Sequence, residues 1–128
     1  MAVKIILAQL RALQSSVENL KKITETVQKA AADGAQMVVF PEYMMSYPEE
    51  KGGKSEQQPL FGAFATALCA LAQTHGVWLV CGMTERSGKP YGLPYNTILI
   101  ISGAGNVAAV HRKTHLYDAF HWQESRDY

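Results

Sequence analysis

Two glutamates and a lysine stand close to the ends of apolar segments in this sequence. Glu42 follows the apolar segment 36–40 and Pro41, which cannot donate a ladder hydrogen bond and must end a strand. A carboxyl group at the lip of a buried strand is in a position where it could act as a general base. The alternative is a solvated glutamate without a chemical role.

Lys113 lies in the basic segment 111–115, which ends another apolar stretch. An ammonium group held at a strand end could stabilise a developing oxyanion, although basic strand ends are often only solubilising. Glu124 adds a second carboxylate a short way along the chain. Each of these residues is weak evidence alone, so their meaning depends on the elements that position them.

The first elements are a strand and a helix. Segment 3–10 is apolar and rich in β-formers, which predicts a largely buried strand. Ser15 and Glu18 have the spacing of a capping box, and the helix that they begin is expected to stop at Asp33 and Gly34. Its expected buried face is Val17, Leu20, Ile23, Val27 and Ala30.

A second strand, a loop and a second helix are expected next. Segment 36–40 is the strand, and the polar segment 43–58 is a long surface loop. Pro59 suits a first helical turn, and the apolar spacing that follows ends at His75 and Gly76.

Strands 77–81, 95–101 and 107–111 follow, the last two flanking a turn over 102–106 as a hairpin. This order of elements predicts an α/β fold in which helices cover one face of a mixed sheet.

Composition limits the classes of protein that the chain can belong to. Its 128 residues are 48% hydrophobic and 18% charged, which indicates a globular domain and excludes disorder, collagen and coiled coil. The formal net charge of +1 and the lack of a basic block argue against nucleic acid as a partner. No apolar run reaches the roughly 18 residues of a membrane helix, so we expect no membrane contact and a cytoplasmic location. Cys69 and Cys81 lie in apolar sequence and are expected to be reduced thiols.

Two cofactor hypotheses also arise. Gly103, Gly105 and Ala108 fit the dinucleotide pattern G-x-G-x-x-A, but a strand-like run follows them, so a hairpin turn is the better interpretation. A metal site is the second hypothesis, although the spacing of its ligands matches no strong signature. Its ligands would be His111, His115, His121, Asp118 and Glu124.

Taken together, the motifs resemble one family. Ala8-Gln9, Phe40-Pro41-Glu42, the segment 111–116 and Gln123-Glu124-Ser125 occur in the order and approximate spacing of the nitrilase or carbon-nitrogen hydrolase superfamily. Within it the chain resembles the group of bacterial amidases that includes deaminated glutathione amidase-like and aliphatic amidase-like members.

The resemblance implies a nitrilase-like four-layer α-β-β-α sandwich, of which this chain, 1–128, would be the N-terminal half. It implies hydrolysis of a small amide through a cysteine thioester, without a cofactor. Glu42 would be the general base, Lys113 would stabilise the oxyanion, and Glu124 would position the lysine and the substrate. The aromatic residues Tyr117, Phe120 and Trp122 could wall the substrate site, although core or interface positions are the commoner use.

The family's nucleophilic cysteine lies downstream of its second glutamate, and neither Cys69 nor Cys81 matches that motif. We therefore expect a partial domain whose isolated chain has no amidase activity. The uncovered sheet face of a half-sandwich would favour a homodimer or a larger homo-oligomer. The alternative is a non-catalytic truncated product or an assembly module.

Overall fold

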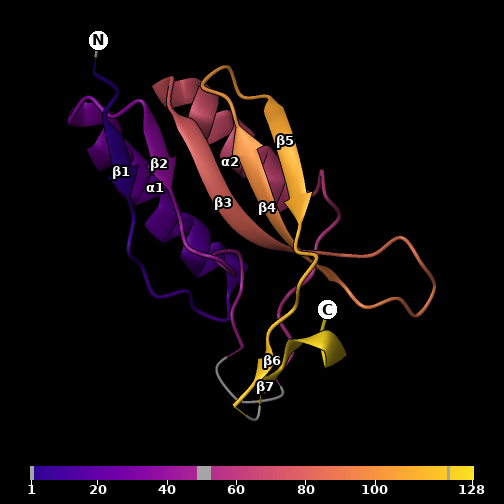
Figure 1. The fold of residues 1–128 in the computed structure, drawn as a ribbon. Coiled ribbons are helices and arrows are strands. Elements are labelled where there is room, and N and C mark those ends of the chain that lie inside the picture. The colour runs from indigo at the N-terminus through magenta and orange to yellow at the C-terminus, as the bar shows by residue number, and fades with distance from the viewer. Residues whose placement is uncertain (1, 49–52, 121) are drawn as a thin grey trace.

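The computed structural model describes residues 2–48, 53–120 and 122–128, and its central feature is a mixed five-stranded sheet (Figure 1). The strands lie in the order β1-β2-β3-β4-β5, parallel from β1 to β3 and antiparallel from β3 to β5. Their bounds are Ile5–Leu7, Met37–Val39, Trp78–Glu85, Tyr95–Ile101 and Val107–Arg112.

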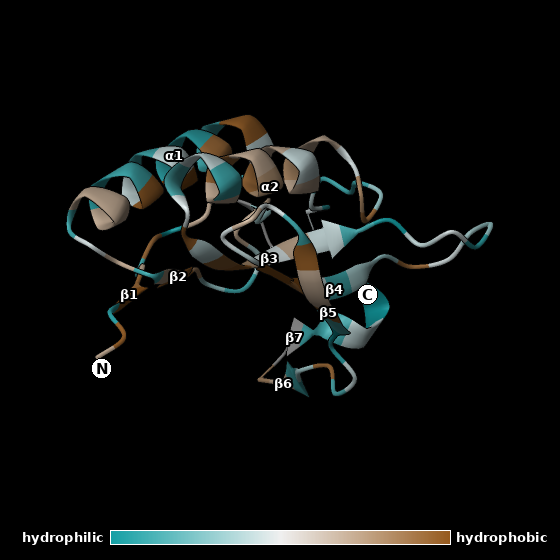
Figure 2. Ribbon diagram, turned by 90° about the horizontal axis from the view of Figure 1, so that it is seen from above, coloured by the Kyte–Doolittle hydropathy of each residue, from teal (hydrophilic) through white to brown (hydrophobic). Residues whose placement is uncertain are grey.

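Both long helices, α1 (Ser16–Ala32) and α2 (Ala63–His75), cover the same face of the sheet (Figure 2). The Ser15 side chain accepts a hydrogen bond from the backbone N–H of Glu18 and begins α1, as the capping pattern predicts. Gly76 ends α2 with a left-handed φ of 63°, a conformation that glycine adopts readily. The predicted α/β architecture with helices on one face is confirmed.

The predicted start of the second helix at Pro59 is wrong. The Pro59 carbonyl accepts a hydrogen bond from the N–H of Gly62 and closes a turn before the helix. The side-chain oxygen of Gln58 then accepts from the N–H of Phe64, so a residue outside the helix caps its first turn. Strand β3 is also longer than predicted, because its pairing with β4 extends to Glu85.

Two burial predictions are also wrong. Val17 is 77% exposed on α1, whereas Asn19 is buried because its side chain hydrogen-bonds the backbone of Leu13 and Met45. Strand β1 is short and largely exposed, with Leu7 at 77%, because it lies at the sheet edge and no element of the described part of the chain covers its outer face.

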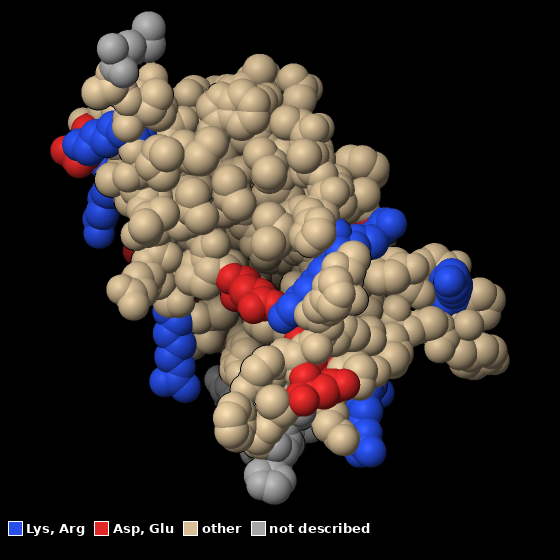
Figure 3. Space-filling model, in the orientation of Figure 1, with Lys and Arg blue, Asp and Glu red and all other residues tan. Residues whose placement is uncertain are grey.

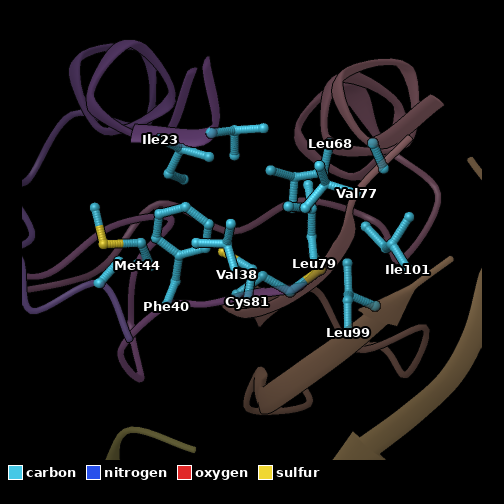
Figure 4. Packing of buried hydrophobic residues seen from close by; sticks show 14 of the residues in the cluster. Ile23, Val38, Phe40, Met44, Leu68, Val77, Leu79, Cys81, Leu99 and Ile101 are labelled. Carbon is cyan, nitrogen blue, oxygen red and sulfur yellow. The ribbon is translucent and has the colours of Figure 1, made fainter. Parts of the chain in front are cut away.

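The hydrophobic core fills the space between the helices and the sheet (Figure 4). Side chains from the inner faces of α1 and α2 meet the sheet residues that point toward them, and Cys81 is among these. Buried core residues include Ile23, Val38, Phe40, Leu68, Leu79, Leu99 and Ile101.

Neither α1 nor α2 lies over the opposite face of the sheet, which we call the open face (Figure 2). Successive strand residues point to opposite faces, so neighbours of the core residues, such as Leu7, Trp78 and Ile98, point to the open face. In the orientation of Figure 1 this face appears as a broad uncharged area, with charged side chains gathered beyond its lower end (Figure 3).

The hairpin predicted over 102–106 is confirmed, and strand β5, not a helix, follows Gly105. This geometry lacks the helix N-terminus that a dinucleotide would need after the glycines. The segment after β5 forms a small sheet of β6 (Asp118–Ala119) and β7 (Trp122–Gln123), and then the 3-10 turn η1 (Glu124–Arg126). Neither of the described long helices has the length and hydropathy needed to span a bilayer.

Candidate active site

The directions of the strands bring distant residues to one edge of the sheet. Strands β2, β3 and β5 all end at this edge, and the antiparallel β4 begins there. Glu42 follows β2, Asn96 lies at the start of β4, and Lys113 follows β5. The N–H of Lys113 donates to the carbonyl of Asn96 at 2.8 Å, which places these two residues opposite each other.

Gly82 makes room for the turn that carries Glu42. A Cβ atom at this glycine would lie 2.8 Å from the backbone nitrogen of Tyr43 and 3.1 Å from the Cα of Glu42. The N–H of Met45 donates to the carbonyl of Gly82 at 3.2 Å and ties the turn to β3. The turn therefore lies directly on the open face of the sheet.

Lys113 joins the two glutamates that the sequence singled out. Its Nζ lies 2.9 Å from Oε1 of Glu42 and 3.0 Å from Oε2 of Glu124. Burial by itself would lower the pKa of Lys113, but the two carboxylates outweigh burial and raise this pKa, so the ammonium form is favoured. The structure thus brings all three predicted site residues together, and their catalytic roles stay a prediction.

Sequence reasoning missed further hydrogen-bond donors in the site. The side-chain nitrogen of Asn96 lies 2.5 Å from Oε1 of Glu42 and 2.9 Å from Oε1 of Glu124. The Tyr43 hydroxyl donates to Oε1 of Glu124 at 2.5 Å, and the N–H of Tyr117 donates to its Oε2 at 2.6 Å. The position of Tyr43 directly after Glu42 was the signal that could have found it.

The two carboxylates differ in how fully they are bound. Each oxygen of Glu124 accepts from two donors, and the residue is 1% exposed. Burial would raise the pKa of Glu124, but these donors outweigh burial and lower the pKa to about 2. Both donors to Glu42 bind its Oε1, so its Oε2 has no partner among the described residues, and its side chain is 43% exposed. Glu42 is therefore the carboxylate with an oxygen free to accept a proton.

Glu42 lines a cavity of about 440 Å³, a volume in the range of small-molecule sites. Tyr117 lines this cavity, whereas Phe120 is 91% exposed and lies outside the lining. The Trp122 side chain lies outside what the structure describes. The lining consists of Glu42, Tyr43, Tyr47, Lys113, Tyr117 and Glu124.

Neither cysteine belongs to this site. Cys81 is fully buried in the core, and burial strongly raises the pKa of its thiol. Cys69 lies half-buried on α2, and burial raises its thiol pKa as well. Neither thiol lines the cavity beside Glu42. Both environments disfavour the thiolate, which is the nucleophilic form.

The candidate metal ligands that the structure describes do not form a metal site. Among the residues that the structure describes, no group of three or more His, Cys, Asp or Glu side chains could hold a metal ion. His121, one of the proposed ligands, lies outside the described residues. Glu124, another of them, is engaged by Lys113.

Comparison with known proteins decides the family. The model of the carbon-nitrogen hydrolase family matches residues 5–128. The chain belongs to this family. Among its relatives, a hydrolase of Mycobacterium tuberculosis is 36% identical over 128 residues, covering 96% of this chain and 44% of that protein. The deaminated glutathione amidase of Bos taurus is 31% identical over 120 residues, covering 89% and 36%. This carbon-nitrogen hydrolase chain thus spans less than half the length of these relatives.

Solved structures share the fold. An amidase from Nesterenkonia sp. AN1 in complex with butyramide matches with a TM-score of 0.76 and 21% identity, covering 98% of this chain and 47% of that one. A carbon-nitrogen hydrolase from Helicobacter pylori G27 matches with the same TM-score and 20% identity, covering 98% and 44%. The predicted half of a nitrilase-like sandwich is therefore confirmed as the fold.

Proposed function

We propose that this chain carries the base and the lysine of an amidase site that hydrolyses a small amide through a cysteine thioester. One observation carries the proposal: the Lys113 ammonium lies between two carboxylates, of which Glu42 keeps one oxygen without a partner among the described residues, and all three side chains line a cavity of about 440 Å³. General-base chemistry needs such an unoccupied oxygen, and oxyanion stabilisation needs a cation already in place.

The chemistry follows from this division between the carboxylates. Glu42 accepts the proton of the cysteine thiol, and the thiolate attacks the amide carbon. The carbonyl oxygen becomes an oxyanion, which the Lys113 ammonium stabilises. The C–N bond then breaks, and the amine leaves with the proton held by Glu42. Water that loses a proton to Glu42 hydrolyses the thioester and releases the acid and the thiol. Glu124 stays ionised throughout and holds the lysine.

The thiol in this proposal comes from residues outside 1–128. Cys69 and Cys81 lie away from the cavity, and their raised thiol pKa values oppose nucleophilic use. By comparison, a mutant of the Nesterenkonia amidase shows covalent addition of the acetamide moiety of fluoroacetamide at its active-site cysteine. We accordingly expect the isolated 128-residue chain to be inactive, and we place the working protein in the cytoplasm, where thiols stay reduced.

Ammonia release from butyramide tests the function. The polypeptide encoded by the whole reading frame should release ammonia, and Glu42→Gln should slow the reaction by about a hundredfold or more. Residues 1–128 alone should release none. Release by residues 1–128 would contradict the external thiol, and Cys69→Ala and Cys81→Ala would then identify the nucleophile. A reading frame that ends at Tyr128 would instead favour the non-catalytic assembly module.

We also propose that the 128-residue chain self-associates through the open face. Apolar residues on this face, such as Leu7 and Trp78, are exposed to solvent. An apolar sheet face that nothing covers favours association. Light scattering at micromolar concentration should find a dimer or a larger assembly, and Leu7→Lys should shift it toward monomer. Val17→Lys is the matched control, because Val17 is equally exposed at 77% but lies on α1. A stable monomer of the unsubstituted chain would contradict this proposal.

A further inference from the structure

Tyr43 has an unusual backbone conformation beside the candidate base. Its φ of 57° lies in the left-handed region, which bulky residues rarely adopt. Such strain persists only where the surroundings enforce it, and it is common at functional sites. Here the turn over Gly82 enforces it, and the Tyr43 and Glu42 side chains line the same cavity.

The Tyr43 side chain is held along its whole length. Its ring packs against the rings of Tyr47 and Tyr128, with centroids 5.7 Å and 5.5 Å away. Its hydroxyl lies 2.5 Å from Oε1 of Glu124. Burial, followed by the hydrogen bond to Glu124, strongly raises the pKa of Tyr43, so the hydroxyl stays protonated and remains a donor.

We infer that Tyr43 is a positioning residue, whose hydroxyl fixes the Glu124 carboxylate in the orientation that holds Lys113 beside Glu42. The other donor to the same carboxylate oxygen is Asn96, which also binds Glu42. Asn96 alone therefore cannot fix Glu124 independently of Glu42. The Tyr43 hydroxyl has no second acceptor among the described residues, so it anchors Oε1 of Glu124 independently of Glu42. The N–H of Tyr117 anchors Oε2 in the same way.

The catalytic value of this positioning rests on the proposed function. The hydrogen bond from Tyr43 to Glu124 can nevertheless be tested in the 128-residue chain without an amide substrate. Tyr43→Phe removes the hydroxyl and keeps the ring between Tyr47 and Tyr128. A ¹³C NMR titration of the glutamate carboxyl carbons, with the Glu124 signal assigned through Glu124→Gln, should show the pKa of Glu124 raised by about one unit. Tyr47→Phe is the control, because the Tyr47 hydroxyl makes no hydrogen bond within the described part of the chain.

Two results would overturn the inference. One is a Glu124 titration in Tyr43→Phe that cannot be distinguished from that of the unsubstituted chain. The other needs no variant to fold: a pKa of Glu124 in the unsubstituted chain that is not below its ordinary value of 4.5 would contradict the anchor.

Measurements of amide hydrolysis distinguish the positioning role of Tyr43 from the proposed amidase function. In the polypeptide of the whole reading frame, Tyr43→Phe should lower kcat and leave KM almost unchanged, because the hydroxyl orients the catalytic groups and does not bind the substrate. A raised pKa of Glu124 without any amide hydrolysis would refute the proposed function and leave the anchor standing. Full activity of Tyr43→Phe would refute the positioning role and leave the amidase standing.

Discussion

Gly82 and Tyr43 are in contact through their backbones, with a Cβ atom at Gly82 placed only 2.8 Å from the Tyr43 nitrogen. Because backbone atoms cannot swing aside as a side chain can, Gly82→Ala must displace the turn that carries Glu42. We expect a loss of about 1–3 kcal/mol in the free energy of unfolding. Urea unfolding measures it.

Gly88→Ala is the control for this substitution, because no atom lies within 4 Å of a Cβ at Gly88. The unfolding free energy of Gly88→Ala should match that of the unsubstituted chain. Equal stability of Gly82→Ala and Gly88→Ala would show that the turn lies farther from β3 than the structure has it.

The second prediction concerns acid. The pKa of Glu124 is about 2 in the folded protein, below its ordinary value of 4.5. A carboxyl group whose pKa falls on folding stabilises the fold above its unfolded pKa, and this contribution is lost as the pH falls toward the folded pKa. Stability worth up to about 3 kcal/mol should therefore disappear between about pH 5 and pH 2.

Urea unfolding at several pH values, compared with Glu124→Gln, checks this prediction. The amide variant keeps the shape of the side chain but cannot titrate, so its stability should depend less on pH in this range. Parallel pH profiles for the two chains would assign acid sensitivity to other groups.

The third prediction concerns the ion pair beside the site. Glu85 is 3% exposed and accepts two hydrogen bonds from Arg112, at 2.5 Å and 2.8 Å, and this contact lowers the pKa of Glu85. Among the residues that the structure describes, Arg112→Met would leave this buried carboxylate with the Thr97 hydroxyl as its one partner. We expect a loss of about 2–4 kcal/mol, since an unpaired buried charge is costly.

Thermal and urea unfolding measure the effect of Arg112→Met. Arg86→Met is its control, because Arg86 is exposed and its guanidinium donates to the Gln57 carbonyl without an acidic partner in the described residues. If the two variants were equally stable, the Arg112 contact would be no stronger than a surface hydrogen bond.

The fourth prediction concerns thiol reactivity. Burial raises the pKa of Cys69 and Cys81, so iodoacetamide should label both slowly in the folded chain. Mass spectrometry should find Cys81, which is fully buried, protected until the chain unfolds, while Cys69 labels first. Rapid labelling of Cys81 under native conditions would contradict its position in the core.

Local signals in the sequence predicted the elements well where one residue decides the structure. Ser15 begins α1 and Gly76 ends α2, as expected, because each satisfies a backbone requirement at a helix end. Pro59 misled because a proline fits a turn as well as a first helical turn. Val17 misled because apolar spacing alone does not say which of two adjoining stripes faces the core.

The charged residues of the candidate site could be predicted from the sequence, but its other hydrogen-bond donors could not. Glu42, Lys113 and Glu124 were found through the order of motifs, and the structure brings them together. Asn96 was missed, because an amide at the start of a strand carries no signal until the pairing of β4 with β5 is known. Hydrogen bonds between residues far apart in sequence depend on this register, which local patterns do not encode.

The antiparallel pairing of β3 with β4 has a consequence for a cut chain. The connection between these strands is exposed at Tyr91, and such loop tips are preferred sites of proteolysis. A cut there would leave Glu42 on one fragment and Lys113 with Glu124 on the other. The ladder from Leu79 to Glu85 would then be the main link between the two fragments. A nicked chain that keeps the lysine beside both carboxylates would therefore be a two-piece complex held mainly by this strand pair, with Leu99 and Ile101 packed in the shared core.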